Sequence, residues 1–346
     1  MLKINHTKLQ AGDIILTRSQ LGLNSAIIRL GTWGSFSHAS LYLGEGSYMD
    51  STPEGVHSGN LYRLIFAHSS YVKALRLKDE YITQDIIKNA TNYVRSKYSQ
   101  EYSKTHALMS VPWAKAKGAD TKNRAFCSRL VASAFTSAGL NIVDNPNFAS
   151  PEDLNQSSYF FEVNNITEPA NEIELNAPFE KGHILEQQKN ITSKLFKSFR
   201  HASGKDIQTF EQAILATIEQ TSIDSVFTNT ITDSGYFELK DQAFLTVPWI
   251  KNPVTFLMQG NFLDIDDFNN RVQRELNSIA YNLERYEDQK NSFWLLNQEF
   301  PNNKFISKLL SFYNELVQEY KIAVLLFNGM LDSPIAKQFA TLINRN

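Results

Sequence analysis

Residues 125–135 read AFCSRLVASAF and contain Cys127, the only cysteine of the chain. Apolar residues recur after Cys127 at steps of three and four, up to Gly139; they are Leu130, Val131, Ala134 and Phe135. This spacing predicts a buried amphipathic helix with Cys127 in its first turn. Unpaired N–H groups and a partial positive charge at a helix N-terminus favour a thiolate, which is the nucleophilic form of cysteine. Such a nucleophile needs a base and a group that orients the base.

Both partners are expected in a hairpin earlier in the chain. Residues 35–44, SFSHASLYLG, place His38 at the start of a strand, and Asp50 lies on the return strand, SYMDS. Side chains alternate between the faces of a strand, so the loop length decides whether His38 and Asp50 share a face. A three-residue loop, Gly44-Glu45-Gly46, pairs position 40 with position 50 and puts both side chains on one face. A two-residue Glu45-Gly46 loop puts them on opposite faces, and the pattern leaves both loops open.

A cysteine, a histidine and a carboxylate together can carry out acyl transfer. The imidazole takes the thiol proton and later protonates the leaving group, while the carboxylate orients the imidazole. The thiolate attacks a carbonyl, and N–H groups at the helix start hold the oxyanion. Singly, each residue has a plainer interpretation: a small buried apolar cysteine, a structural or solvated histidine, and a turn aspartate. The hypothesis that Cys127 is the nucleophile, His38 the base and Asp50 the orienting group therefore rests on their joint placement.

Five ordered blocks extend this pattern over residues 8–163: GDIIL at 12–16, SHASLYLG at 37–44, an acid before GV at 55–56, FCSRLVA at 126–132 and SPEDL at 150–154. The series resembles the circularly permuted papain-like cysteine hydrolases, which include the permuted NlpC-type amidases and lecithin:retinol acyltransferase. In that family the histidine strand precedes the cysteine helix, as in this chain. The resemblance implies that His38 is the base and Cys127 the nucleophile, and Asp50 falls where the family carries a third polar residue. Arg129 replaces the glutamate that usually follows the family's Cys-Ser pair, which leaves the substrate class open.

Composition narrows the remaining function classes. The chain has 346 residues and a formal net charge of −2, values that suit an ordinary globular protein of two domains and give no sign of nucleic-acid binding. A single cysteine excludes an intramolecular disulfide framework and a cysteine-rich metal site. His57, His68 and His106 lack the spacing of metal ligands, so we expect neither a metal nor a cofactor.

The chain carries no recognisable secretory signal or membrane span. Residues 1–6 have neither a long apolar stretch nor a small-residue cleavage site, and the apolar run at 322–327 is too short to cross a bilayer. We expect a protein that is cytoplasmic or exported by a dedicated secretion system. Peripheral membrane contact stays open, and the pattern does not specify an oligomeric state.

The expected fold class is α+β, with two domains. Residues 1–163 are predicted to form a permuted papain-like domain, a small antiparallel sheet packed with helices; residues 164–180 are predicted to be a linker, and residues 181–346 a mainly helical domain of unknown role. The 3.6-residue period predicts helices at 82–98, 184–201, 207–221, 268–286, 293–298 and 304–329, with shorter candidates at 24–30 and 108–115.

Three functions are compatible with this pattern. The first is a cysteine hydrolase that works through an acyl-enzyme as an amidase or peptidase, including on cell-wall peptides. The alternative is a phospholipase or acyltransferase acting on lipid acyl chains, such as a secreted antibacterial toxin. The third is a non-catalytic binding module on the same scaffold. Peptide and lipid substrates both present an acyl carbonyl to sulfur, so the chemistry at Cys127 is the same for the first two.

Overall fold

The computed structural model describes residues 1–18, 35–52, 55–98, 100, 127–176, 184–259, 262 and 264–334. The chain divides into two compact units. The first comprises Met1–Phe196 with Asp206–Gln212, and the second comprises Lys197–Lys205 with Ala213–Asn346. The helices expected at residues 24–30 and 108–115 lie outside the described residues.

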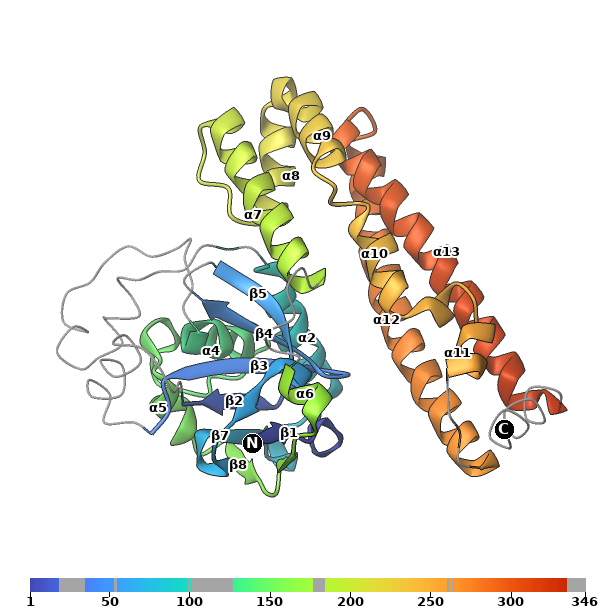
Figure 1. The fold of residues 1–346 in the computed structure, drawn as a ribbon. Helices are drawn as coiled ribbons and strands as arrows, with labels where there is room; N and C mark the ends of the chain where they lie inside the picture. Colours follow the sequence, from blue (N-terminus) through green and yellow to red (C-terminus); the bar gives the residue numbers. More distant parts are fainter. Residues whose placement is uncertain are drawn as a thin grey trace. The chain divides into compact units, whose positions relative to one another are not determined.

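The first unit is built on an antiparallel sheet, drawn in blue and green in Figure 1. Among the described residues this sheet has six strands, in the order β5-β4-β3-β2-β7-β8. Their bounds are β2 Ile14–Thr17, β3 His38–Gly44, β4 Ser47–Thr52, β5 Gly55–Asn60, β7 Val72–Leu77 and β8 Phe160–Val163. Sheet and helices together confirm the α+β class that the sequence predicts.

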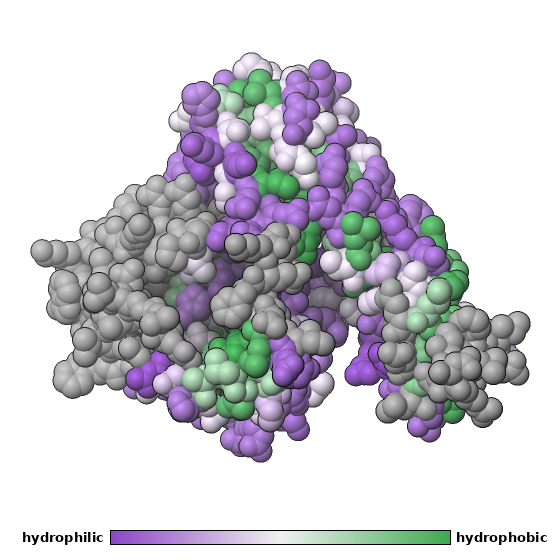
Figure 2. All heavy atoms as spheres, in the orientation of Figure 1, coloured by the Kyte–Doolittle hydropathy of each residue, from purple (hydrophilic) through white to green (hydrophobic). Residues whose placement is uncertain are grey.

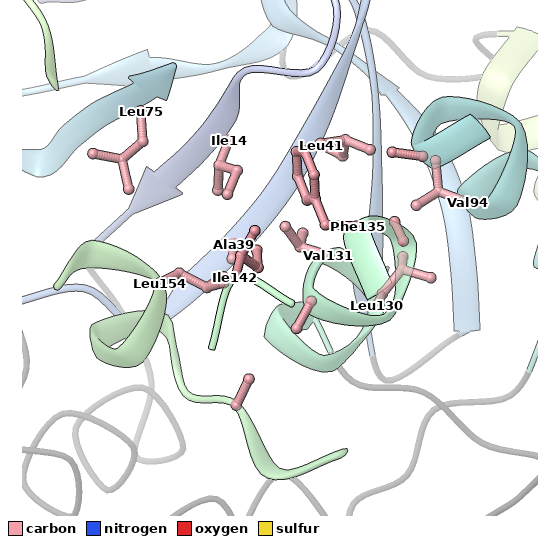
Figure 3. Close-up of a cluster of buried hydrophobic side chains, with 14 of the residues drawn as sticks. Ile14, Ala39, Leu41, Leu75, Val94, Leu130, Val131, Phe135, Ile142 and Leu154 are labelled. Carbon is pink, nitrogen blue, oxygen red and sulfur yellow. The ribbon is translucent and has the colours of Figure 1, made fainter. Parts of the chain in front are cut away.

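Two helices, α2 (Gln84–Ser96) and α4 (Cys127–Ser137), pack against each other and cover one face of this sheet. Alternate residues of β3, among them Ala39 and Leu41, point into the core below them, where they meet Val131 and Phe135 of α4 (Figure 3). Every one of these four side chains is fully buried. Burial of this apolar face fixes α4, and with it Cys127, against the central strand.

A second, smaller sheet covers part of the opposite face. Its strands within the described chain are β6 (Ile65–Phe66), β1 (Leu2–Ile4) and β9 (Thr167–Pro169), in that order. Ile4 and Phe66 from this sheet share a buried cluster with Ile15 and Tyr42 of the large sheet. Tyr42 thus points away from α4, while its neighbours Leu41 and Leu43 point toward it.

The stretch predicted as a linker takes part in this second sheet. β9 pairs antiparallel with β1, with Lys3 opposite Glu168, and helix α6 (Glu172–Asn176) follows. Lys3 forms ion pairs with Glu168 and with Glu174, and Asn5 donates a hydrogen bond of 2.7 Å to Glu168. Opposite charges on paired strands explain why so polar a segment is ordered here. The division between the two units falls further along, within α7 (Ile184–Ser203).

The second unit is helical. After α7 it contains α8 Phe210–Glu219, α9 Asp224–Asp233, α10 Leu239–Thr246, α11 Val254–Gln259, α12 Ile265–Glu299 and α13 Lys304–Asp332. The separate helices predicted at residues 268–286 and 293–298 form the single helix α12, because the polar residues between them include no helix breaker. The core of the α12–α13 pair is rich in aromatic side chains, such as Phe262, Phe268 and Phe327.

The surface of the second unit is not uniformly polar. Figure 2 shows hydrophobic atoms among the hydrophilic ones along its helices. Leu245, Met258 and Leu325 are 80%, 64% and 71% exposed. Within the described ranges, no helix is both long enough and apolar enough to cross a membrane.

Candidate active site

His38 is the first residue of β3, a strand with neighbours on both sides. It lies opposite Thr17 in the β2–β3 ladder. The backbone of β3 is held by antiparallel pairing with β2 and β4, and Ala39 behind it is fully buried. The imidazole therefore projects from a strand that is hydrogen-bonded on both sides, and 28% of the His38 side-chain surface is exposed.

Asp50 reaches His38 because of a bulge in the hairpin. The turn between Gly44 and Ser47 has only two residues, Glu45 and Gly46, both with positive φ (50° and 74°) as in the primed hairpin turns. The ladder then shifts by one residue between Tyr42 and Gly44, and beyond the shift Leu41 lies opposite Met49.

This register is the one that pairs position 40 with position 50 and puts His38 and Asp50 on one face. The three-residue loop considered in the sequence analysis is thus replaced by a two-residue turn and a bulge, with the same result. Asp50 Oδ2 lies 2.8 Å from His38 Nε2, and the Asp50 side chain is 13% exposed.

Cys127 is the first residue of α4, as the period of the sequence predicts, and is 5% exposed. Its sulfur is hydrogen-bonded to the His38 side chain and to the backbone N–H groups of Ala39 and Ser128. The strand that carries the histidine thus also supplies a donor to the sulfur. The structure brings all three predicted residues together in one chain of contacts: Asp50, His38 and Cys127.

Burial and charge act in opposite directions on the Cys127 thiol. Burial raises the pKa of Cys127, but the positive charge of His38, its hydrogen bond and the two backbone donors outweigh burial. The pKa of Cys127 is therefore lowered from that of an ordinary thiol.

Burial and charge also oppose each other at His38, and there they shift the pKa in the reverse directions. Burial lowers the pKa of the imidazole, whereas the Cys127 thiolate and the hydrogen bond to Asp50 raise it, and the pKa of His38 lies well above its ordinary value. The two shifts favour the same state, a thiolate beside an imidazolium. In this state the sulfur is ready to act as a nucleophile, and the histidine holds a proton that it can donate.

Several contacts that hold the site have no signature in the sequence. Ser128 Oγ donates a hydrogen bond of 2.6 Å to the carbonyl of Ala149 and so ties the start of α4 to a distant loop. That loop is held in turn by a capping box, in which Ser150 and Asp153 bond each other's backbone N–H groups at the start of α5 (Pro151–Asn155). The capping box is visible in the sequence as S-x-x-D, but its link to Ser128 is a tertiary contact.

Two other residues lie near the site in sequence or in space. His57, which lacks the spacing of a metal ligand, is buried on β5 opposite Asp50 and packs edge-on against the ring of Tyr98. Arg129 follows Cys127 by two positions, and burial lowers the pKa of its guanidinium while Tyr93 of α2 acts in the opposite direction.

No group of three or more His, Cys, Asp or Glu side chains that could hold a metal ion occurs in the part of the chain that the structure describes.

An antiparallel sheet, a helix that begins at a cysteine and a histidine strand that precedes this helix define the permuted papain-like class. The chain belongs to the permuted papain-like amidase family, YaeF/YiiX, C92, whose characteristic sequence matches residues 8–235. The match includes His38, Asp50 and Cys127 and continues past residue 163 into the helical region.

Comparison with solved structures gives a similarity to the metalloprotein yiiX from Escherichia coli O157:H7. The identity is 16% and the TM-score 0.35, over 45% of this chain and 97% of that one. No curated protein sequence matches the chain.

Proposed function

We propose that the protein is a cysteine hydrolase that cleaves an amide bond through an acyl-enzyme, with Cys127 as nucleophile, His38 as general base and acid, and Asp50 as the group that orients the imidazole. The observation that carries the proposal is the continuous contact from Asp50 through His38 to the Cys127 sulfur. The amidase family to which the chain belongs supports hydrolysis as the class of reaction.

The proposal gives each nitrogen of the imidazole a role. Nε2 is committed to Asp50, so Nδ1 is the nitrogen that exchanges a proton with the sulfur of Cys127. The thiolate attacks the carbonyl carbon, and we assign the Cys127 N–H, in the first turn of α4, to hold the oxyanion.

The first half of the reaction ends when the C–N bond breaks. The imidazolium donates its Nδ1 proton to the amide nitrogen, the amine leaves, and the acyl group stays on sulfur as a thioester. In the second half the neutral imidazole takes a proton from water, and the hydroxide attacks the thioester. The carboxylic acid leaves and the thiolate–imidazolium pair is restored.

A lipid substrate is the second candidate, since an ester carbonyl would react at sulfur in the same way. One observation favours it: large apolar side chains such as Leu245 and Leu325 are exposed on the helical unit, where they could contact a lipid surface. Amide hydrolysis remains the leading proposal because the family match extends over about two thirds of the chain and describes an amidase.

The test is the intact mass of the full-length protein after incubation with two substrate pools, cell-wall peptide fragments and mixed phospholipids. Cys127→Ala is the control, since it cannot form a thioester. A peptidyl increment on the native protein supports the amidase, and a fatty-acyl increment assigns the enzyme to lipids. An unmodified protein that consumes neither pool, and whose Cys127 also fails to react with iodoacetamide at neutral pH, would overturn the catalytic proposal in favour of a binding module.

A further inference from the structure

A polar hollow of about 930 Å³ lies at the end of α4 opposite to Cys127. It is bordered by Tyr93 of α2, by Ser133 and Thr136 of α4, and by the segment that follows this helix, including Asn141 and Asp144. The residues of α4 that line the hollow, Ser133 to Ser137, follow Cys127 by roughly 9 to 15 Å along the helix axis. The hollow is therefore distinct from the reacting groups, yet it is built on the same helix.

The lining limits the chemistry of a ligand. Hydroxyl and side-chain amide groups predominate, two carboxylates (Asp144 and Asp153) are present, and no lysine, arginine or histidine occurs among the described residues of the lining. The carbonyl end of α4 adds partial negative charge. The negative potential of the two carboxylates and the helix end disfavours phosphates and other anions. An acyl chain is disfavoured because it would bury many polar groups without hydrogen bonds.

Some of these polar groups are already used and others are not. Asp153 belongs to the capping box of α5, and Ser157 Oγ donates 2.7 Å to the carbonyl of Ile142. The side chains of Thr136, Asn141 and Asp144, in contrast, make no hydrogen bond or ion pair with the residues that the structure describes. A ligand can therefore bond them without breaking an existing contact.

The hollow is also preformed. α4 ends in a Schellman motif, in which Leu140 N–H bonds the carbonyl of Phe135 and Gly139 has a φ of 91°. Ile142 then turns back into the hydrophobic core, where it is 2% exposed. A segment fixed at both of these points loses little conformational entropy when a ligand binds.

We propose that this hollow binds a neutral, polyhydroxylated ligand, namely a short oligosaccharide. A sugar hydroxyl both donates and accepts, and it is matched by the amide of Asn141, which offers both functions, and by the carboxylate of Asp144, which accepts. Tyr93 and Tyr159 also border the hollow, but their rings already contact Lys97 and Tyr81, so hydrogen bonds carry the recognition. The volume lies in the range of small-molecule sites, about 300–1,000 Å³. This site is additional to the proposed hydrolysis and does not depend on it.

The experiment is a titration of the full-length protein with cellotriose, maltotriose and chitotriose, followed by saturation-transfer NMR and calorimetry. The variant is Asn141→Ala combined with Asp144→Ala, both at exposed positions, and the matched control is Asn314→Ala, an exposed asparagine of α13. We expect at least one trisaccharide to bind. The double variant should weaken its affinity about tenfold or more, because two groups with hydrogen bonds to the ligand are lost, while the control binds like the native protein.

Two outcomes would overturn the proposal: binding of none of the three sugars at about 10 mM, or equal affinity of the double variant and the control. Spermine serves as a cationic probe. If it binds in an Asp144-dependent way and the sugars do not, the hollow is a cation site and the saccharide proposal is wrong. Cys127→Ala separates this question from catalysis, since it abolishes the proposed hydrolysis and should leave sugar binding unchanged.

Discussion

One network of polar groups in each unit can be compared, and the two networks have different roles. In the helical unit, both carboxylate oxygens of Asp224 accept backbone N–H groups at the start of α13, from Lys304 and Phe305, at 2.8 Å each. Asn303 caps the same helix and also donates to Thr217. Asp224 and Asn303 thus complete the start of α13 by accepting its first backbone N–H groups.

In the first unit, one set of polar groups converges on a single sulfur. Asp50 contacts His38, His38 contacts Cys127, and the imidazole remains 28% exposed. The comparison teaches that burial and hydrogen bonding alone do not mark a site. A site is marked by groups whose protonation states depend on one another and that solvent or substrate can reach.

The strongest test of this contrast is Cys127→Ala. We expect kcat/KM for the acyl substrate to fall by at least about 10³-fold, because the acyl-enzyme cannot form. The melting temperature should change little, since the lost group is one small sulfur at the end of a helix. Activity that survives the substitution would show that Asp50, His38 and Cys127 have a structural role only.

Asp50→Asn should have the next largest effect, a fall in kcat/KM of roughly 10²- to 10⁴-fold, because the amide orients the imidazole poorly and carries no charge. The pH profile should change as well. Asp50 helps to raise the pKa of His38, so its removal lowers that pKa, and the imidazolium is lost at a lower pH. The alkaline limb of the profile should therefore move to lower pH.

Asp85→Asn, which removes the same charge from an exposed position of α2, is the matched control. An alkaline limb that stays in place in Asp50→Asn, despite the loss of activity, would mean that Asp50 supports the hairpin and does not act on the imidazole.

The parts of this site that follow local rules could be predicted from the sequence. The position of Cys127 in the first turn of α4 follows from the apolar period. The alternation of side chains along a strand reduces the possible registers of His38 and Asp50 to two. The bulge that selects the register could not be predicted, because it depends on how the Glu45-Gly46 turn fits the twist of the two strands.

Contacts between distant segments were also beyond sequence reasoning. Residues 164–180 are polar and read as a linker, but Lys3 and Glu168 bring part of them into a sheet with the N-terminal strand. The pairing joins residues more than 160 positions apart, so no local pattern reports it. The bond from Ser128 to Ala149 is of the same kind. The division of residues 1–346 into domains at 163 and 181 remains a prediction.

Asp224→Ala tests the other side of the comparison, and here we expect an effect on stability. The substitution removes the acceptor of the Lys304 and Phe305 N–H groups, of which the second is buried, at a cost of about 1–3 kcal/mol. Urea unfolding of the full-length protein measures it. Asp233→Ala, at an exposed position of α9, should stay within about 0.5 kcal/mol of the native protein. Equal stability of the two variants would show that the Asp224 carboxylate does not stabilise the helical unit.

Ser128→Ala should have the smallest effect, and it acts on both properties. The hydroxyl bonds Ala149 at 2.6 Å, so its loss should cost about 1 kcal/mol of stability and leave a buried carbonyl unpaired. The first turn of α4 then loses its tie to the loop, and the sulfur and the N–H groups around it are held less closely. We expect kcat to fall a few-fold, because small misplacements of a nucleophile reduce the rate, while KM stays near its native value. Ser137→Ala, at the exposed end of the same helix, serves as the control. A loss of stability with an unchanged kcat would show that this contact supports the fold alone, and that the site is held in place by β3 and the core beneath α4.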